Sequence, residues 1–151
     1  KYQPTNVFFN VTDKRSNRHL LQILREGEAA ELLPTEMALD DIIAKDLAPQ
    51  FKNQGLVITT SRTDKQIDVI IDEALISVDQ SALSFESKNK LSIRFIVKNT
   101  DKTLTKTFNA TGQSNGPFKA DIAVLEKDFT QQLTDLLTKA LANTEIQDIL
   151  K

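Results

Sequence analysis

Three consecutive runs with a side-chain period of two constrain this chain more than any other feature. Apolar and polar residues alternate along residues 67–72, 91–98 and 104–110. Such a period is typical of strands with one apolar and one polar face. The short polar segment 99–102 between the second and third runs predicts a hairpin. We therefore expect an antiparallel meander over residues 65–111, with one face that other elements must cover.

The sequence also indicates where the strands of the meander could begin and end. Ala74, Ile76 and Val78 could extend its first strand, and residues 80–89 then read as a loop or a loosely paired hairpin tip. Residues 112–117 contain two glycines and a proline, which predicts the end of the sheet there.

The N-terminal third contains a tail, a strand and an ambiguous segment. Residues 1–5 read as a tether, and residues 6–11 as a strand with Val7, Phe9 and Val11 on one face. Two short apolar runs, 20–24 and 29–33, flank a polar segment around Gly27, which favours a second hairpin. Leu20 and its neighbours also fit a helix over residues 19–25, because five residues do not separate the two periods.

Two amphipathic helices are expected to cover the sheet. An apolar stripe predicts a first helix over residues 36–54, kinked at Pro49 and ended by Gly55 in the left-handed position that follows a helix. A short strand follows at 56–60. A longer stripe predicts a second helix over residues 121–142. Thr144 and Gln147 have the spacing of a capping box, which predicts a short third helix over 144–150.

The fold class that follows is α/β of the α+β type. We expect a mostly antiparallel sheet with two main helices packed on one face, in two layers, forming a single domain over residues 6–151. A net charge of -2 gives no basic surplus for nucleic acid, so we expect no nucleic-acid partner. The chain has no cysteine, which excludes disulfides and thiolate chemistry.

No motif supports an enzyme, a cofactor or a metal site. Residues 112–116 match the G-x-S-x-G pattern of a nucleophile elbow, but the preceding strand reads as antiparallel and the single histidine, His19, lies upstream of Ser114. Asp68 and Asp72 would lie about 13 Å apart along one strand at roughly 3.3 Å per residue, too far for a retaining glycosidase pair. We therefore expect no catalytic, cofactor or metal residues.

Seven charged residues are the candidates for an interaction with a partner. Four belong to a charged loop after the first strand, which could bind an anion or a partner but fits a solvated turn as well. Three lie on the polar face of the predicted meander. The two groups are Asp13, Lys14, Arg15 and Arg18 in the loop, and Asp68, Asp72 and Arg94 on the sheet.

The order of these pieces resembles the YajG-like lipoprotein family of Gram-negative bacteria. The residues that carry the resemblance are 7–11 followed by Asp13 and Arg15, the first helix up to Gly55, the segment 74–80, and the C-terminal residues 144–150. The family supplies no catalytic residues. The resemblance implies a precursor with a signal peptide and an acylated cysteine, held in the outer membrane and facing the periplasm, with Lys1 near the trimmed edge.

Together these inferences predict a non-enzymatic envelope lipoprotein. We expect it to be a protein-interaction or accessory module, with an envelope protein as its partner and with the membrane reached through an N-terminal lipid. The alternative is a binding protein for a small envelope ligand, such as a glycan or a muropeptide fragment, which would require a pocket with convergent polar groups.

Overall fold

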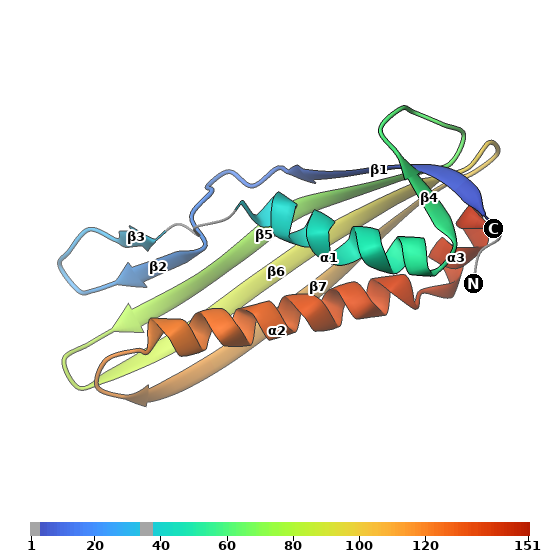
Figure 1. The fold of residues 1–151 in the computed structure, drawn as a ribbon. Coiled ribbons are helices and arrows are strands. Elements are labelled where there is room, and N and C mark those ends of the chain that lie inside the picture. The colour runs from blue at the N-terminus through green and yellow to red at the C-terminus, as the bar shows by residue number, and fades with distance from the viewer. Residues whose placement is uncertain (1–3, 34–37) are drawn as a thin grey trace.

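The structure is a computed structural model that describes residues 4–33 and 38–151. It has an α+β fold in which a long, curled sheet carries helices along its length (Figure 1). The elements of the described residues are, in chain order, β1 (Thr5–Asp13), β2 (Leu21–Leu24), β3 (Glu31–Leu33), α1 (Leu39–Asn53), β4 (Leu56–Thr59), β5 (Gln66–Gln80), β6 (Ser84–Lys98), β7 (Thr103–Pro117), α2 (Ile122–Leu141) and α3 (Thr144–Leu150).

Strand β5 organises the sheet because it has neighbours on both edges. On one edge its first half pairs with β1 and its last residues pair with β2, both in parallel. On the other edge β6 pairs antiparallel with nearly the whole strand. β4 then extends the sheet beyond β1, β3 beyond β2, and β7 beyond β6. Every strand of the described sheet is therefore attached to β5 directly or through one neighbour.

A β-bulge at Asp72 keeps both apolar runs of β5 on the same face. The register with β6 shifts between Ile71 and Glu73, which leaves one extra residue on β5. An extra residue reverses the side-chain alternation of a strand. The inward side chains are accordingly Ile67, Val69 and Ile71 before the bulge and Ala74, Ile76 and Val78 after it, all buried. The predicted extension of the first strand through Val78 is thus confirmed.

The prediction of a mostly antiparallel sheet is wrong. β1 pairs in parallel with both β4 and β5, and β2 pairs in parallel with β5. Parallel neighbours need a crossover connection, and α1 provides one between β1 and β4. A period of two reports that a strand has two unlike faces, but it carries no information on the direction of the neighbouring strand.

The predicted single helical layer is not clear in the structure either. α1 contacts β1 and β4, whereas α2 contacts β7, and α3 contacts β6 and β7 (Figure 1). The helices are therefore distributed along a curled sheet and do not form one clear layer on one face of a flat sheet.

The two hairpins formed by β5, β6 and β7 are longer than the sequence predicts. Of the two alternatives for residues 80–89, the hairpin tip is confirmed and the loop is wrong, because Gln80 pairs with Phe85 and only residues 81–83 lie outside the two strands. β7 likewise continues to Pro117. Each of the three strands has 15 residues, which corresponds to about 50 Å at roughly 3.3 Å per residue. The predicted connector over 99–102 is confirmed.

The ambiguous N-terminal segment is a hairpin and not a helix. β2 and β3 pair antiparallel around a turn that contains Gly27, whose φ of 74° lies in the left-handed region. β1 begins at Thr5, opposite Leu56. Residues 1–3 of the expected tether lie outside the described residues.

Helix α1 has the apolar stripe and the C-terminus that its sequence predicts. Pro49 lies inside the helix, which continues to Asn53. Gly55 follows with a φ of 104°, and its N–H donates to the Lys52 carbonyl at 3.0 Å. The expected start at Glu36 falls within residues 34–37, outside the described part of the chain. The buried stripe consists of Leu39, Ile43, Leu47 and Phe51.

Helices α2 and α3 pack on the β6 and β7 part of the sheet and complete the hydrophobic core. α2 begins where predicted, with the Asp121 side chain accepting a hydrogen bond from the Val124 N–H. Its length and hydropathy do not suit it to crossing a bilayer, and the same holds for the other described helices. The Lys65 ammonium and the Asn99 amide donate to the Leu150 and Ile149 carbonyls. These bonds hold the C-terminus at the end of the sheet where β1 begins (Figure 1).

The cap of α3 differs from the predicted capping box. The N-cap is Asn143, whose side chain accepts a hydrogen bond from the Ile146 N–H at 3.0 Å. The Gln147 side chain donates to the Leu141 carbonyl, whereas a capping box would have it accept from the Thr144 N–H. Asn is among the best N-cap residues because its short side chain reaches the free N–H groups of the first turn.

Replacing Asn143 with Ala is therefore expected to lower the free energy of unfolding by about 1 kcal/mol, the usual effect of losing an N-cap. Thr144→Ala is the matched control and should change it little, since Thr144 is exposed and makes no capping bond. Urea denaturation of both variants measures the difference. A larger loss of unfolding free energy for Thr144→Ala than for Asn143→Ala would show that Thr144 is the N-cap of α3.

Candidate functional site

Asp13 and Arg15 of the predicted loop form a buried ion pair. The Arg15 Nη2 lies 2.7 Å from the Asp13 Oδ2, and the two side chains are 6% and 2% exposed. The Arg15 Nε also donates to both carboxylate oxygens, at 2.9 and 3.1 Å. This is the two-pronged geometry in which a guanidinium binds a carboxylate most strongly. Each charge is matched within the chain, so the Arg15 guanidinium is not free to bind an anion.

The pair fills a gap in the pairing of β5. Between the segments paired with β1 and β2, the edge of β5 near the bulge has no neighbouring strand. Arg15 Nη1 donates to the Ala74 carbonyl there, and the Lys14 N–H donates to the Ile71 carbonyl. Buried carbonyls need such partners. The loop therefore continues the hydrogen bonding of the sheet with a side chain in place of a strand.

The environment of Asp13 lowers the pKa of its carboxyl. Burial alone would raise that pKa, but the hydrogen bonds from the Arg15 side chain and backbone N–H, with the charges of Arg15 and Arg18, outweigh burial. Arg18 contributes less, because its Nη1 lies 3.9 Å from the carboxylate and its side chain is 69% exposed. Lys14 is exposed as well. An interaction role for Lys14 and Arg18 stays a prediction.

Arg15→Ala is expected to lower the free energy of unfolding by about 3–5 kcal/mol, because it leaves the Asp13 carboxylate buried without its partner. The matched control is Arg18→Ala, with a loss of less than about 1 kcal/mol for an exposed pair. Urea denaturation at neutral pH distinguishes the two. Equal losses of unfolding free energy would show that the Asp13–Arg15 pair stabilises the fold no more than an exposed ion pair does.

The pH dependence of the same pair has a definite sign. A carboxyl whose pKa is lower in the folded state stabilises the fold above its unfolded pKa, and this contribution is lost as the pH falls through the folded pKa. The free energy of unfolding should therefore drop as the pH falls below about 4, the unfolded pKa of an Asp, and through the lower folded pKa, and it should drop less steeply in Asp13→Asn.

The polar face of the meander carries the second predicted group. Arg94 on β6 binds Asp72 at the bulge with two hydrogen bonds, of 3.0 and 3.1 Å, and both side chains are about one-third exposed. Asp68 lies nearer the start of β5, opposite Ile96. No hydrogen bond or ion pair reaches its side chain within the described residues. The structure thus brings Asp72 and Arg94 together and leaves Asp68 apart.

The glycines of the G-x-S-x-G pattern have a packing role inside β7. A Cβ at Gly112 would lie 2.9 Å from the Asn89 amide, and one at Gly116 would lie 2.8 Å from the Phe85 ring. Both glycines thus leave room for side chains of β6. His19 lies just before β2, three strands away from Ser114, which is roughly 14 Å at 4.8 Å per strand. A direct hydrogen bond between the two is therefore excluded.

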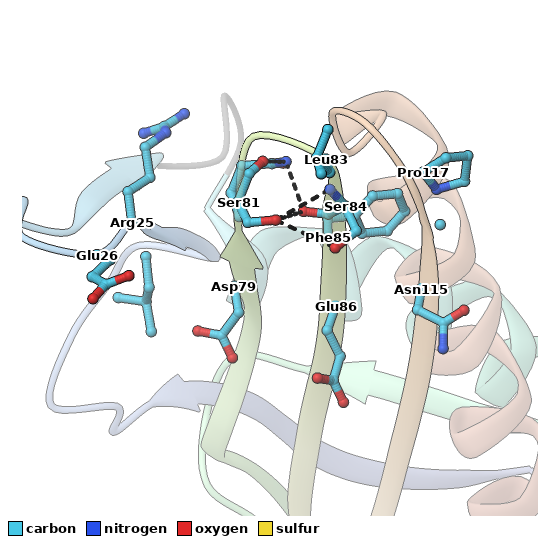
Figure 2. A pocket seen from close by; sticks show the side chains of 13 residues that line it. Arg25, Glu26, Asp79, Ser81, Leu83, Ser84, Phe85, Glu86, Asn115 and Pro117 are labelled. Carbon is cyan, nitrogen blue, oxygen red and sulfur yellow. Dashed lines mark hydrogen bonds between the residues drawn. The ribbon is translucent and has the colours of Figure 1, made fainter.

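A hollow that the sequence did not indicate lies at the end of the sheet opposite α3 and the start of β1. Its volume is about 1100 Å³, and its walls are the end of β2, the β5–β6 turn and the end of β7. Figure 2 shows Asp79 on β5 and Glu86 on β6 side by side in it, with Leu83 at the turn. Glu26 lines the same hollow. Among the described residues, no group of three or more His, Cys, Asp or Glu could hold a metal ion.

A smaller cavity lies between α2 and the sheet. It measures about 180 Å³ and is lined by polar residues that include Asn89 and Gln132. Their side-chain oxygens are buried without a hydrogen-bond partner in the described part of the chain. Its volume is well below the roughly 300–1,000 Å³ of sites for drug-sized ligands.

Comparisons with known proteins give a family and a fold. A family model described as an uncharacterized lipoprotein matches residues 1–151. This agrees with the resemblance to YajG-like lipoproteins. No curated protein matches the chain.

Two solved structures are similar to the chain at low sequence identity. One is a Xanthomonas campestris protein of family DUF330, with a TM-score of 0.58, 13% identity, and coverage of 93% of this chain and 82% of that one. The other is a minor lipoprotein from Acinetobacter baumannii, with a TM-score of 0.40, 11% identity, and coverage of 95% and 89%. The first likeness concerns the fold alone.

Proposed function

The chain belongs to this uncharacterized lipoprotein family, and we propose that it is a non-enzymatic lipoprotein of the outer membrane that faces the periplasm and binds another envelope protein. Family membership alone implies a membrane-anchored envelope protein. The outer membrane, the periplasmic face and the protein partner are our proposal, and the supporting observation is the arrangement of the two ends of the sheet.

The two ends of the sheet differ in character. β1 begins at one end, and α3 is held there by Lys65 and Asn99 (Figure 1). At the other end, about 50 Å away at roughly 3.3 Å per strand residue, Leu83 and Phe118 are 76% and 68% exposed. A lipid on a segment before β1 would hold the first end at the membrane. The second end, which we call the distal tip, would then meet the partner.

Exposed apolar residues at one place are a feature of interaction sites. Leu83 and Phe118 come from different loops, and the Phe118 N–H donates to the Leu83 carbonyl at 2.7 Å. They are therefore neighbours, and not two scattered surface residues. Their position also favours a partner over the membrane that carries the anchor, because the distal tip points away from it.

A binding protein for a small envelope ligand is the second candidate. The volume of the hollow at the distal tip favours it, since about 1100 Å³ accommodates a glycan or muropeptide fragment. The polar cavity beneath α2 is too small for either. The hollow is also open along the end of the sheet (Figure 2), which suits a polypeptide segment better than a ligand that must be enclosed.

Photocrosslinking of the full-length lipidated protein in its own envelope tests the proposal. A photoreactive phenylalanine analogue at Leu83 should give a specific crosslinked protein, and density fractionation should place the protein with the outer membrane. The matched position is Val57, which is 48% exposed on β4, at the end where β1 begins. Crosslinks at Val57 alone, or recovery of the protein free of membranes, would contradict it. Binding of a muropeptide that slows hydrogen exchange at the backbone amides of Ser81 and Asn115, which line the hollow, would instead support the second candidate.

A further inference from the structure

The distal tip holds the backbones of its two exposed apolar residues, Leu83 and Phe118, in a fixed arrangement. Phe118 has a φ of 62°, the left-handed region, where a bulky residue is an outlier. It is the one non-glycine residue of the described chain with a positive φ. Such a conformation persists only where the surroundings impose it.

The Gln80 side chain holds Phe118 in this conformation. Its Nε2 donates to the Phe118 carbonyl at 2.8 Å and to the Ser81 carbonyl at 2.8 Å, and its Oε1 accepts from the Ala120 N–H at 3.0 Å. One amide thus joins the β5–β6 turn to the segment after β7. Because both loops are fixed, the backbones that carry Leu83 and Phe118 are preorganised side by side, and preorganisation reduces the entropy lost on binding.

The hollow that Leu83 lines also has three acidic residues in its walls. Asp79 and Glu86 are directly opposite each other in the register of β5 and β6, an arrangement of like charges that destabilises a sheet. Glu26 lies in the same hollow. No ion pair or side-chain hydrogen bond reaches these three carboxylates within residues 4–33 and 38–151. Arg25, at the same wall, is paired with Glu31 at 3.0 Å.

We propose that the distal tip binds a cationic polypeptide segment with an apolar anchor residue. Lys or Arg side chains of the segment would lie over Asp79, Glu86 and Glu26, and its anchor residue would pack on Leu83 and Phe118. The inference rests on the proposed function and adds the chemistry of the partner. Charge complementarity decides between occupants, since unpaired carboxylates attract a basic segment and repel an anionic lipid surface.

Fluorescence anisotropy with two short labelled peptides tests this inference. One peptide contains two leucines among lysines and serines, and the other has glutamate in place of each lysine. The lysine peptide should bind the protein, weaken with added salt because the ion pairs are screened, and bind at least about tenfold more tightly than the glutamate peptide.

Paired variants separate the two parts of the site. Asp79→Asn with Glu86→Gln should weaken binding of the lysine peptide about tenfold or more, and so should Leu83→Ser with Phe118→Ser. Asp68→Asn and Val57→Ser remove the same kinds of group elsewhere and should leave binding unchanged. Removing the opposed carboxylates should not lower the melting temperature, because it relieves a repulsion. Loss of binding in that variant is therefore not loss of the fold.

Three results would overturn the inference. They are equal binding of the two peptides, binding that survives the Asp79 and Glu86 substitutions, and insertion of Leu83 and Phe118 into zwitterionic vesicles in flotation assays, which would assign the apolar pair to lipid. If any of these occurs while Leu83 still crosslinks to an envelope protein, the proposed function stands and only the chemistry of the partner is wrong. If the crosslink is also absent, the proposed function fails as well.

Discussion

The pairing of β5 on both edges is the constraint on which the rest of this structure depends. One edge must change its partner from β1 to β2, and the bulge at Asp72 lies where that change occurs. The backbone there would be left without partners if the loop after β1 did not reach it. Arg15 donates a hydrogen bond to the Ala74 carbonyl there. Asp13 neutralises and orients Arg15, and both side chains are buried. A charged loop is thus part of the sheet.

The same strand sets the distance between the two ends of the molecule. β5, β6 and β7 are of equal length, so the β5–β6 turn at one end is separated by the full strand from α3 and the start of β1 at the other (Figure 1). At the far end, Gln80 is the last residue of β5, and its side chain fixes Phe118. The element that builds the core therefore also positions the apolar pair at the distal tip.

Much of this fold could be predicted from the sequence, and the failures have physical causes. Apolar periodicity located the strands and helices, and Gly55 marked the end of α1 correctly. Strand direction was wrong because periodicity does not depend on it. The polar side chains of residues 80–89 do not distinguish a loop from a hairpin tip, and only the backbone pairing shows that the segment is a hairpin.

The candidate site was less accessible from the sequence. Asp13 and Arg15 were recognised as a charged loop, but only tertiary structure shows that they are buried. The distal tip combines residues that lie far apart along the chain, such as Leu83 and Phe118. The one local sign was a large apolar residue within the polar segment 81–84, since a hydrophobic side chain at the end of a hairpin has no strand to pack against.

The register of β5 against β6 on the two sides of Asp72 can be measured directly, because the chain has no cysteine of its own. Ser77 faces Lys88 beyond the bulge, and Asp68 faces Ile96 before it. Directly opposed Cβ atoms lie close enough for a disulfide. Ser77→Cys with Lys88→Cys and Asp68→Cys with Ile96→Cys should therefore both oxidise readily, and Ser77→Cys with Ser87→Cys should not. Rapid oxidation of the Ser77 and Ser87 pair, with none at Ser77 and Lys88, would show a strand without the bulge and contradict this account.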